Sequence, residues 1–240
     1  MKIAVYFTPL GLNAGDMSGR GVVVVDVLRA TTSIVTALAN GAKAVVPAAT
    51  SEEAVRLTAN LEKNGYVLAG ERKSLKMEGF ALGNSPREMT PEAVGGKTIY
   101  MSTTNGTPAL VAAHGGEPVL VAAAVNFSAV AERARDVFEE RGDLVIVCAG
   151  REKQFALEDG YLAGRLVKAV RKGRRKIALN DAATVALDLP SRFANWAAAL
   201  GASEAARELR AADLGEDVTF SAKADRFTVV PSIVDRRIVA

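Results

Sequence analysis

The chain has 240 residues, of which 49% are apolar and 24% charged, so it can fold around a sizeable core. Thirty Lys and Arg against 27 Asp and Glu give a formal net charge of +3, too small to indicate a dedicated nucleic-acid binder. One cysteine and one histidine exclude an intramolecular disulfide, a Cys-rich zinc site and any site with two His ligands.

The sequence lacks two kinds of segment that would direct the protein to a membrane or out of the cell. No run of about 18 apolar residues is present, so we expect no membrane span. The first ten residues, MKIAVYFTPL, turn polar too soon for a signal peptide. We therefore expect a cytoplasmic protein that works on a small molecule, without a nucleic-acid or membrane partner. A homodimer is the default assembly because it is the commonest one among oligomers.

Apolar runs and helical patterns alternate in the first part of the chain. The pattern predicts strands over residues 22–26, 43–47, 66–69 and 97–101. A helix is expected over 30–40, ended by Gly41, and another begins at a capping Ser51 and ends by Gly65. Residues 72–97 are rich in Gly, Pro and Lys, which predicts an irregular segment.

The alternation continues in the second part. The predicted strands are 118–124, 144–148 and 177–179. The predicted helices are 108–113, one capped by Asn126 and running to Glu140, 157–172, and several within 181–212. Residues 217–240 have a strand-like composition. The basic run 171–176 (RKGRRK) is interpreted as a solvated helix end, because no aromatic platform for nucleic acid accompanies it.

This rhythm predicts an α/β fold with a mostly parallel sheet and helices on both faces. We expect a single domain over 1–240, the alternative being two α/β halves of about 1–125 and 126–240. In open α/β sheets ligands bind beyond the carboxyl ends of the strands. The polar loops at those ends are therefore the candidate site.

The first such loop follows the valine run. Asp26 ends a buried strand, where a carboxylate is costly unless it is paired, hydrogen-bonded or bound to a metal. Arg29 is close enough to pair with Asp26 or to contact an anion. Thr31 and Thr32 place hydroxyls and N–H groups at a helix start, which suits an anion. The alternative is an ordinary capping turn with a structural ion pair.

A second loop repeats this logic. Thr103, Thr104, Asn105 and Gly106 follow a predicted strand, and their small side chains let the backbone approach a phosphate-like group. A plain Asn-Gly turn explains the same residues equally well.

Paired charges mark two further strand ends. Glu158 and Asp159 lie near a predicted helix start, where they either complement the helix dipole or hold Mg²⁺, which takes one or two carboxylates with waters and phosphate. Glu71 and Arg72 place a carboxylate beside a guanidinium. Cys148 ends another strand, where helix N–H groups can stabilise a thiolate, although a buried apolar role is commoner for such a cysteine.

Taken together, these segments resemble the 2-phosphosulfolactate phosphatase family of the ComB type. The matching pieces, in the family's order, are VVVVDVLRATTSIVTALANGA (22–42), GERK…KMEGFALGNSP (70–86), TTNGT (103–107), CAGREKQFALED (148–159) and VPS (230–232). The stretch between Gly150 and Phe155 is more charged here than the small, Gly-containing loop of the family.

The resemblance implies a three-layer α/β/α fold and a Mg²⁺-dependent phosphatase. Its reaction would convert 2-phosphosulfolactate to 3-sulfolactate and phosphate, a step toward coenzyme M. On this basis the catalytic candidates are Asp26, Arg29, Glu71, Cys148 and Asp159, and the metal ligands are Asp26, Glu158 and Asp159. The candidates for substrate binding are Thr31, Thr32, Arg72, Asn84, Ser85, Thr103, Thr104, Asn105, Gly106 and Gly150.

Two questions stay open at this level. The nucleophile is a metal-bound water, Cys148 or Asp26, and water is favoured because the second Asp of an Asp-x-Asp motif is missing after Asp26. The competing functions are a Cys148-based hydrolase or transferase and a binder of small sulfonated or phosphorylated acids without turnover.

Overall fold

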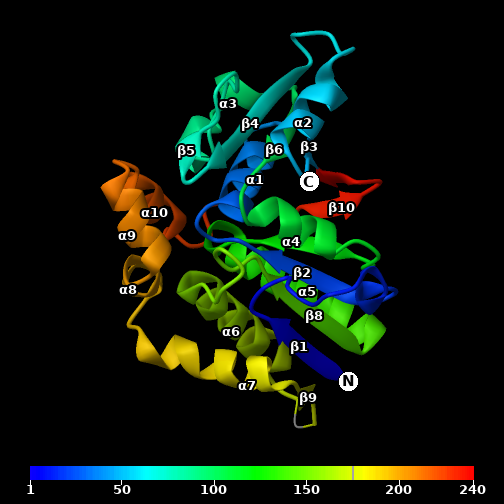
Figure 1. The fold of residues 1–240 in the computed structure, drawn as a ribbon. Helices are drawn as coiled ribbons and strands as arrows, with labels where there is room; N and C mark the ends of the chain where they lie inside the picture. The colour runs from blue at the N-terminus through cyan, green and yellow to red at the C-terminus, as the bar shows by residue number, and fades with distance from the viewer. Residues whose placement is uncertain (175) are drawn as a thin grey trace.

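The computed structural model describes residues 1–174 and 176–240. Eleven strands form one sheet in the order β5-β4-β6-β3-β11-β10-β7-β2-β8-β1-β9 (Figure 1). The strand bounds are β1 Lys2–Tyr6, β2 Gly21–Val25, β3 Ala44–Pro47, β4 Tyr66–Arg72, β5 Leu75–Lys76, β6 Thr98–Ser102, β7 Val119–Ala122, β8 Asp143–Cys148, β9 Ala178–Leu179, β10 Ser232–Val234 and β11 Arg237–Val239.

Two parallel groups of strands make up most of this sheet. β4, β6 and β3 pair in parallel, and so do β7, β2, β8, β1 and β9. The antiparallel hairpin β10–β11 lies between the groups and pairs with β7 on one side and β3 on the other. The C-terminal residues thus join the two parts of the sheet.

Helices cover both faces, which confirms the α/β/α expectation. Their bounds are α1 Ala30–Ala39, α2 Ser51–Thr58, α3 Pro91–Val94, α4 Gly106–Ala112, α5 Phe127–Arg141, α6 Leu157–Arg171, α7 Asp181–Asp188, α8 Trp196–Gly201, α9 Glu204–Ala211 and α10 Gly215–Ser221, with short 3-10 helices η1 Ala14–Met17, η2 Pro86–Glu88, η3 Ala124–Asn126 and η4 Leu189–Arg192.

The strand β2 shows why two cores form. Its side chains alternate, so Val23 and Val25 pack in the core under α5 and α6, whereas Val22 and Val24 pack in the core under α1 and α4. Every residue of β2 is buried. A strand covered on both faces has no position for a polar side chain, which explains the unbroken valine run.

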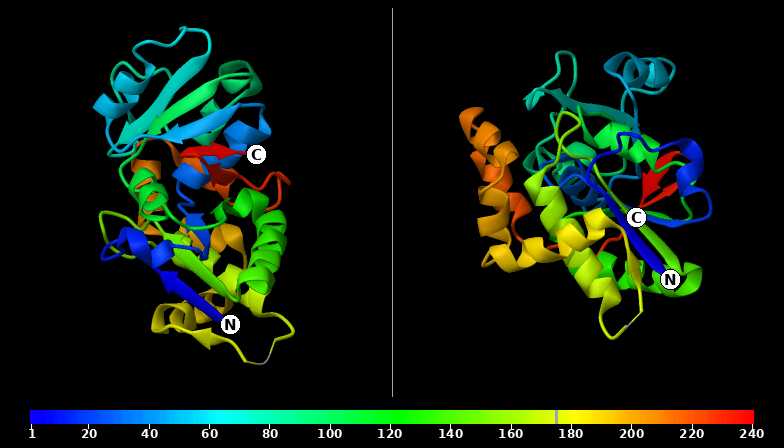
Figure 2. Two further views of the ribbon diagram at one scale, coloured as in Figure 1. Left: turned by 90° about the vertical axis from the view of Figure 1, so that its right-hand side faces the viewer. Right: turned by 60° about the horizontal axis from the view of Figure 1, so that its bottom comes forward.

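The helices α8, α9 and α10 form a column beside the carboxyl ends of the strands (Figures 1 and 2). The predicted strand-like region is therefore wrong at its start, because residues 217–221 belong to α10. Asp217 and Val218 are buried in this helix, and strands begin only at β10. A short amphipathic helix and a strand share a similar apolar content, so composition did not distinguish them.

Two capping expectations change in the structure. Thr50 rather than Ser51 caps α2, since its hydroxyl accepts the Glu53 N–H at 3.1 Å. Asn126 occupies the N-cap position of α5, as expected, but its side chain caps no N–H of that helix, because its Oδ1 accepts the Ala123 N–H at 2.9 Å. The strand β1 was not predicted. In the basic run 171–176, α6 ends at Arg171 and Arg175 lies outside the described residues.

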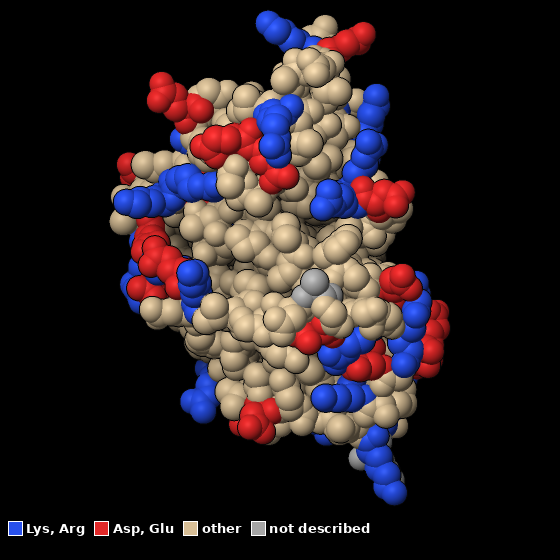
Figure 3. Space-filling view, turned by 45° about the vertical axis from the view of Figure 1, so that its right-hand side comes forward, with Lys and Arg blue, Asp and Glu red and all other residues tan. Residues whose placement is uncertain are grey.

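One face of the molecule has a nearly uncharged centre with Lys, Arg, Asp and Glu around its rim (Figure 3). Leu10 and Val111 are among the large apolar side chains that the fold leaves exposed. In the part of the chain that the structure describes, no helix is long and apolar enough to span a bilayer. The expected homodimer stays a prediction.

Candidate active site

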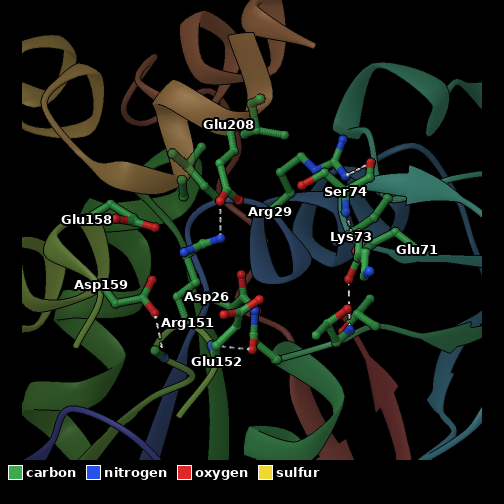
Figure 4. Close-up of a pocket in the computed structure, with 18 residues that line it drawn as sticks. Asp26, Arg29, Glu71, Lys73, Ser74, Arg151, Glu152, Glu158, Asp159 and Glu208 are labelled. Atoms are coloured by element: carbon green, nitrogen blue, oxygen red, sulfur yellow. Dashed lines mark hydrogen bonds and ion pairs between the residues drawn. The ribbon is translucent and has the colours of Figure 1, made fainter. Parts of the chain in front are cut away.

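A small pocket of about 70 Å³ lies where the carboxyl ends of β2, β4, β6 and β8 face α9. Ten of the residues singled out in the sequence line it: Asp26, Arg29, Glu71, Asn84, Thr103, Thr104, Asn105, Gly150, Glu158 and Asp159. Figure 4 shows Glu158 and Asp159 on one side, Arg29 and Glu71 on the other, and Asp26 between them. The fold thus brings together loops that are more than 100 residues apart in the sequence.

Asp26 is the carboxylate at the centre of this pocket. Its Oδ1 accepts the N–H of Ala30 at 3.1 Å, and the side chain is buried. The pKa of Asp26 is raised from its ordinary 3.8 to about 7, mainly because the carboxyl group is buried. The hydrogen bond from Ala30 and the charge of Arg29 oppose this rise, and the charges of Glu71 and Glu158 add to it. A carboxyl group in such surroundings favours a proton or a cation beside it.

Gly106 is required by the close approach of α4 to Asp26. A Cβ on Gly106 would lie 2.4 Å from the Ala30 Cβ and 2.7 Å from Asp26 Oδ2. Gly106 therefore contributes by its missing side chain, and it is not a lining residue of the pocket.

We expect Gly106→Ala to lower both stability and activity, since overpacking costs about 1–3 kcal/mol and the added methyl group pushes on Asp26. Urea unfolding measures stability, and turnover of the phosphate ester that the resemblance implies measures activity. The matched control is Gly65→Ala, where the nearest atom to the new Cβ is the Glu62 carbonyl oxygen at 3.5 Å. Equal behaviour of the two variants would contradict the steric argument.

Asp159 braces two loops of the pocket. Its Oδ1 accepts the Val27 N–H at 2.8 Å, and its Oδ2 accepts the Gly150 N–H at 3.1 Å. Burial and the charges of Glu158 and Asp26 raise the pKa of Asp159 well above its ordinary value. Burial also raises the pKa of Glu158. Three buried carboxyl groups thus face one another where β2 ends and α6 begins.

Glu71 braces the opposite side in the same way. Its Oε1 accepts the Thr104 N–H at 2.7 Å and its Oε2 accepts the Ser74 N–H at 2.9 Å. The carboxylate therefore holds the loop after β6 against the β4–β5 turn. Because both of its oxygens already accept an N–H, Glu71 acts as a positioning residue in this arrangement.

Arg29 is held by an ion pair that the sequence did not reveal. Its Nη1 lies 2.9 Å from Asp217 Oδ2, and the two side chains are 4% and 0% exposed. Its Nη2 donates to the Ser74 carbonyl at 2.7 Å, and Ser85 Oγ donates to Asp217 Oδ1 at 2.6 Å. Asp217 therefore ties α10 to the start of α1, with the guanidinium at the pocket wall.

The loop after β8 supplies a second arginine. Arg151 pairs with Glu208 of α9, and Figure 4 shows this pair beside Asp26 and Glu158. The loop begins at Gly150, whose φ of +63° and 2.3 Å approach of a Cβ to the Gln154 carbonyl oxygen require glycine. Asn105 Oδ1 accepts the Glu152 N–H at 3.0 Å, which fastens the loop to α4.

Several predicted site residues have other roles. The Thr31 and Thr32 hydroxyls are buried and donate to the Asp26 and Val27 carbonyls at 2.7 and 2.8 Å, so the capping-turn alternative describes them. Arg72 points away, donating to the Glu71 carbonyl at 2.8 Å and Ser102 Oγ at 3.1 Å. Ser85 contacts Asp217 and does not line the pocket.

Cys148 also lies outside the pocket. Its thiol is 0% exposed within the core under α5 and α6, and burial raises its pKa well above the ordinary value, with the charges of Asp159 and Glu158 adding to the effect. A thiol that is buried and protonated is a poor nucleophile. Its position therefore favours the buried apolar role over the catalytic one for Cys148.

Alkylation provides the test for Cys148. We expect iodoacetamide to leave both the folded protein and its turnover unchanged, because the thiol is neither accessible nor ionised. Mass spectrometry should find adducts only after denaturation. Rapid labelling of the native chain with parallel loss of activity would restore the thiol mechanism.

Sequence reasoning did not select several residues that line this site. Lys73, Ser74, Arg151, Glu152 and Glu208 line the pocket, and Asp217 stands behind Arg29. The unusual charge of the 151–154 stretch was a usable signal for Arg151 and Glu152. No local pattern marked Glu208 or Asp217, which reach the site only through the packing of α9 and α10.

The carboxylates suit Mg²⁺ without forming a complete cage. Within residues 1–174 and 176–240, no group of three or more His, Cys, Asp and Glu is arranged as a metal cluster. Mg²⁺ needs only one or two carboxylates, the rest being water and phosphate. Among the described residues no hydrogen bond engages Asp26 Oδ2, whereas both Asp159 oxygens accept an N–H. Asp26 is thus better placed than Asp159 as a donor, and Glu158 lines the same pocket beside it.

This chain is similar to known proteins along nearly its whole length. A family model described as 2-phosphosulpholactate phosphatase matches residues 6–236. A protein of Caldanaerobacter subterraneus subsp. tengcongensis is 38% identical over 239 residues, covering 97% of this chain and 95% of that one. One of Symbiobacterium thermophilum is 37% identical over 227 residues, covering 94% and 96%. One of Clostridium acetobutylicum is 40% identical over 186 residues, covering 78% and 77%. Each is named probable 2-phosphosulfolactate phosphatase.

Proposed function

The chain belongs to the 2-phosphosulpholactate phosphatase family and is a phosphoric monoester hydrolase, and from this premise we propose that it hydrolyses 2-phosphosulfolactate to 3-sulfolactate and phosphate. The observation that supports this proposal is the pocket, in which buried carboxylates face Arg29, Lys73 and Arg151. A small molecule with phosphate, carboxylate and sulfonate groups complements such a mixture of cations and metal-binding oxygens. We further propose a cytoplasmic enzyme on the route to coenzyme M.

The side chains divide into binding and positioning roles. Arg29, fixed by Asp217, and Lys73 bind anionic groups of the substrate, because both line the pocket as cations. The exposed Thr104 hydroxyl is free to contact a phosphate oxygen, while Asn84 lies buried at the wall with no partner for its Oδ1 among the described residues. Glu71 and Asp159 hold the loops in register through paired N–H contacts.

Asp26 and Glu158 are the residues that would hold Mg²⁺, with Asp159 holding the loops beside them through its N–H contacts. When bound, the metal ion would neutralise phosphate charge and lower the pKa of a coordinated water. Without the metal ion, Asp26 is placed to hold a proton at its free Oδ2. The reaction breaks the phosphorus–oxygen bond of the ester, and the proton released by water ends on the alcohol of the product.

The deciding experiment measures inorganic phosphate released from synthetic 2-phosphosulfolactate with Mg²⁺ and with EDTA, beside a panel of other phosphomonoesters. We expect metal-dependent release that favours the sulfonated ester. Release from other esters alone would overturn the substrate and keep the phosphatase. Saturable binding of the ester without phosphate release would favour the non-catalytic binder.

Metal binding should also appear in the pH dependence of stability. Because the pKa of Asp26 is raised from 3.8 to about 7, the folded chain keeps a proton that the unfolded chain has lost between these values. The contribution of Asp26 to stability is therefore present at low pH and is lost as the pH rises through about 7.

Mg²⁺ can replace the missing proton, so we expect the Tm gain from Mg²⁺ to be larger at pH 8 than at pH 5. Differential scanning fluorimetry of wild type and Asp26→Asn provides the measurement. Glu132→Gln, which removes an exposed charge on α5, is the matched control. A gain that is equal at both pH values, or unchanged in Asp26→Asn, would contradict Asp26 as a ligand.

A further inference from the structure

A second groove, of about 860 Å³, lies on the C-terminal half of α6, outside the pocket described above. Its walls come from α6, from the segment 172–174, from Phe127 at the start of α5, and from the end of α7 with η4. None of its lining residues lines the catalytic pocket. The volume falls within the roughly 300–1,000 Å³ that is usual for ligand sites.

One wall of this groove is strongly basic. Arg165, Lys168, Arg171, Lys172 and Arg174 line it, against the single carboxylate of Asp188. Arg174 pairs with Glu139, which lies outside the groove lining. The other four form no ion pair within the described part of the chain. Four uncompensated cations around one concavity favour an anion of several charges.

Arg165 is fixed in this wall without a carboxylate. Its guanidinium carbon lies 4.6 Å from the centre of the Trp196 ring and 5.3 Å from that of Phe127. Its Nη1 donates to the Tyr161 hydroxyl at 3.1 Å. Stacking on aromatic rings holds a guanidinium in place and leaves its charge available to a ligand. Arg165 is therefore a preorganised hydrogen-bond donor for an anionic ligand.

Another part of the groove is apolar. Leu187, Pro190 and the half-buried ring of Phe193 line it. The basic run 171–176 has no aromatic residue of its own, and folding supplies the aromatic surface from η4 and its neighbours. A flat apolar ring suits this wall, and phosphate groups suit the basic one.

We propose that this groove binds a nucleoside polyphosphate, with its phosphates on the α6 wall and its base against Phe193 and Pro190. A single-stranded nucleic acid fits less well, because such proteins need a charged track with several free stacking platforms. This groove is one short concavity, in which the Arg165 guanidinium already covers the rings of Phe127 and Tyr161. The inference does not depend on the proposed reaction, since the two sites share no lining residue.

Trp196 makes the test direct. It is the only tryptophan in the chain and stacks on Arg165, so its fluorescence reports on this groove. Wild-type protein in EDTA is titrated with ATP, ADP, adenosine and pyrophosphate, followed by fluorescence and by calorimetry. We expect saturable binding that is tightest for ATP and weaker for adenosine and for pyrophosphate alone.

The variant Lys168→Gln with Lys172→Gln removes two exposed cations without touching the core. We expect it to keep the wild-type Tm and to bind ATP at least about 10-fold more weakly, as the loss of charge-assisted contacts predicts. Lys63→Gln, an exposed lysine distant in sequence, should bind as wild type does. Asp26→Asn should also bind normally, which excludes ATP in the catalytic pocket as the source of the signal.

Three outcomes would overturn the proposal. One is the absence of saturable ATP binding. Another is equal ATP affinity of the wild type and the double Lys variant. The third is tighter binding of a single-stranded RNA oligomer than of ATP, which would assign the groove to nucleic acid.

Discussion

Asp26→Asn is expected to abolish turnover while the fold survives. The substitution preserves the size of the side chain and the acceptor for the Ala30 N–H, so the β2–α1 turn is retained. It removes the charge that would hold Mg²⁺ and the group whose pKa is raised to about 7. Removing a group that takes part in proton transfer or metal binding costs about 10²–10⁴-fold in rate.

Phosphate release and thermal unfolding measure this result together. Because Asp26 is buried among other carboxyl groups, removing its charge should leave the Tm of the metal-free protein unchanged or higher. Glu132→Gln serves again as the exposed control. Near-normal turnover by Asp26→Asn would remove Asp26 from the mechanism, whatever the Tm.

The second large effect is expected at Asp217, although this residue does not line the pocket. Asp217→Asn leaves the Arg29 guanidinium buried without its ionic partner. Breaking a buried ion pair from one side costs about 3–5 kcal/mol, because the remaining charge is uncompensated. We expect a loss of this order in urea unfolding, together with a KM for the anionic substrate raised at least about 10-fold.

A comparison of KM with kcat separates positioning from simple stability. If Asp217 orients Arg29, KM rises more than kcat falls at temperatures where the variant is fully folded. The double variant Arg29→Met with Asp217→Leu should be more stable than Asp217→Asn, since it removes both buried charges. Asp217→Asn with wild-type KM and reduced stability would leave Asp217 as a purely structural partner of α10.

The strand-end loops could be predicted from sequence because their signals are local. A carboxylate after four valines, two threonine-rich turns and an acidic helix start each stand out in a short window. Parallel strands bring such ends to one edge, and Asp26, Thr104, Asn105 and Glu158 indeed line one pocket. The same local reasoning failed to say whether a hydroxyl faces the pocket or the backbone, as Thr31 and Thr32 illustrate.

The layers, the parallel core of the sheet and the edge that carries the candidate site all follow from the amino-acid pattern, since periodicity and turn residues act over a few positions. The pairing of charges follows instead from the packing of the folded chain. Asp217 reaches Arg29 across 188 positions, and Glu208 reaches Arg151 across 57. These partners depend on how α9 and α10 pack against the sheet. Ion pairing at such separation arises from the packing of whole helices, and no short window of residues encodes it.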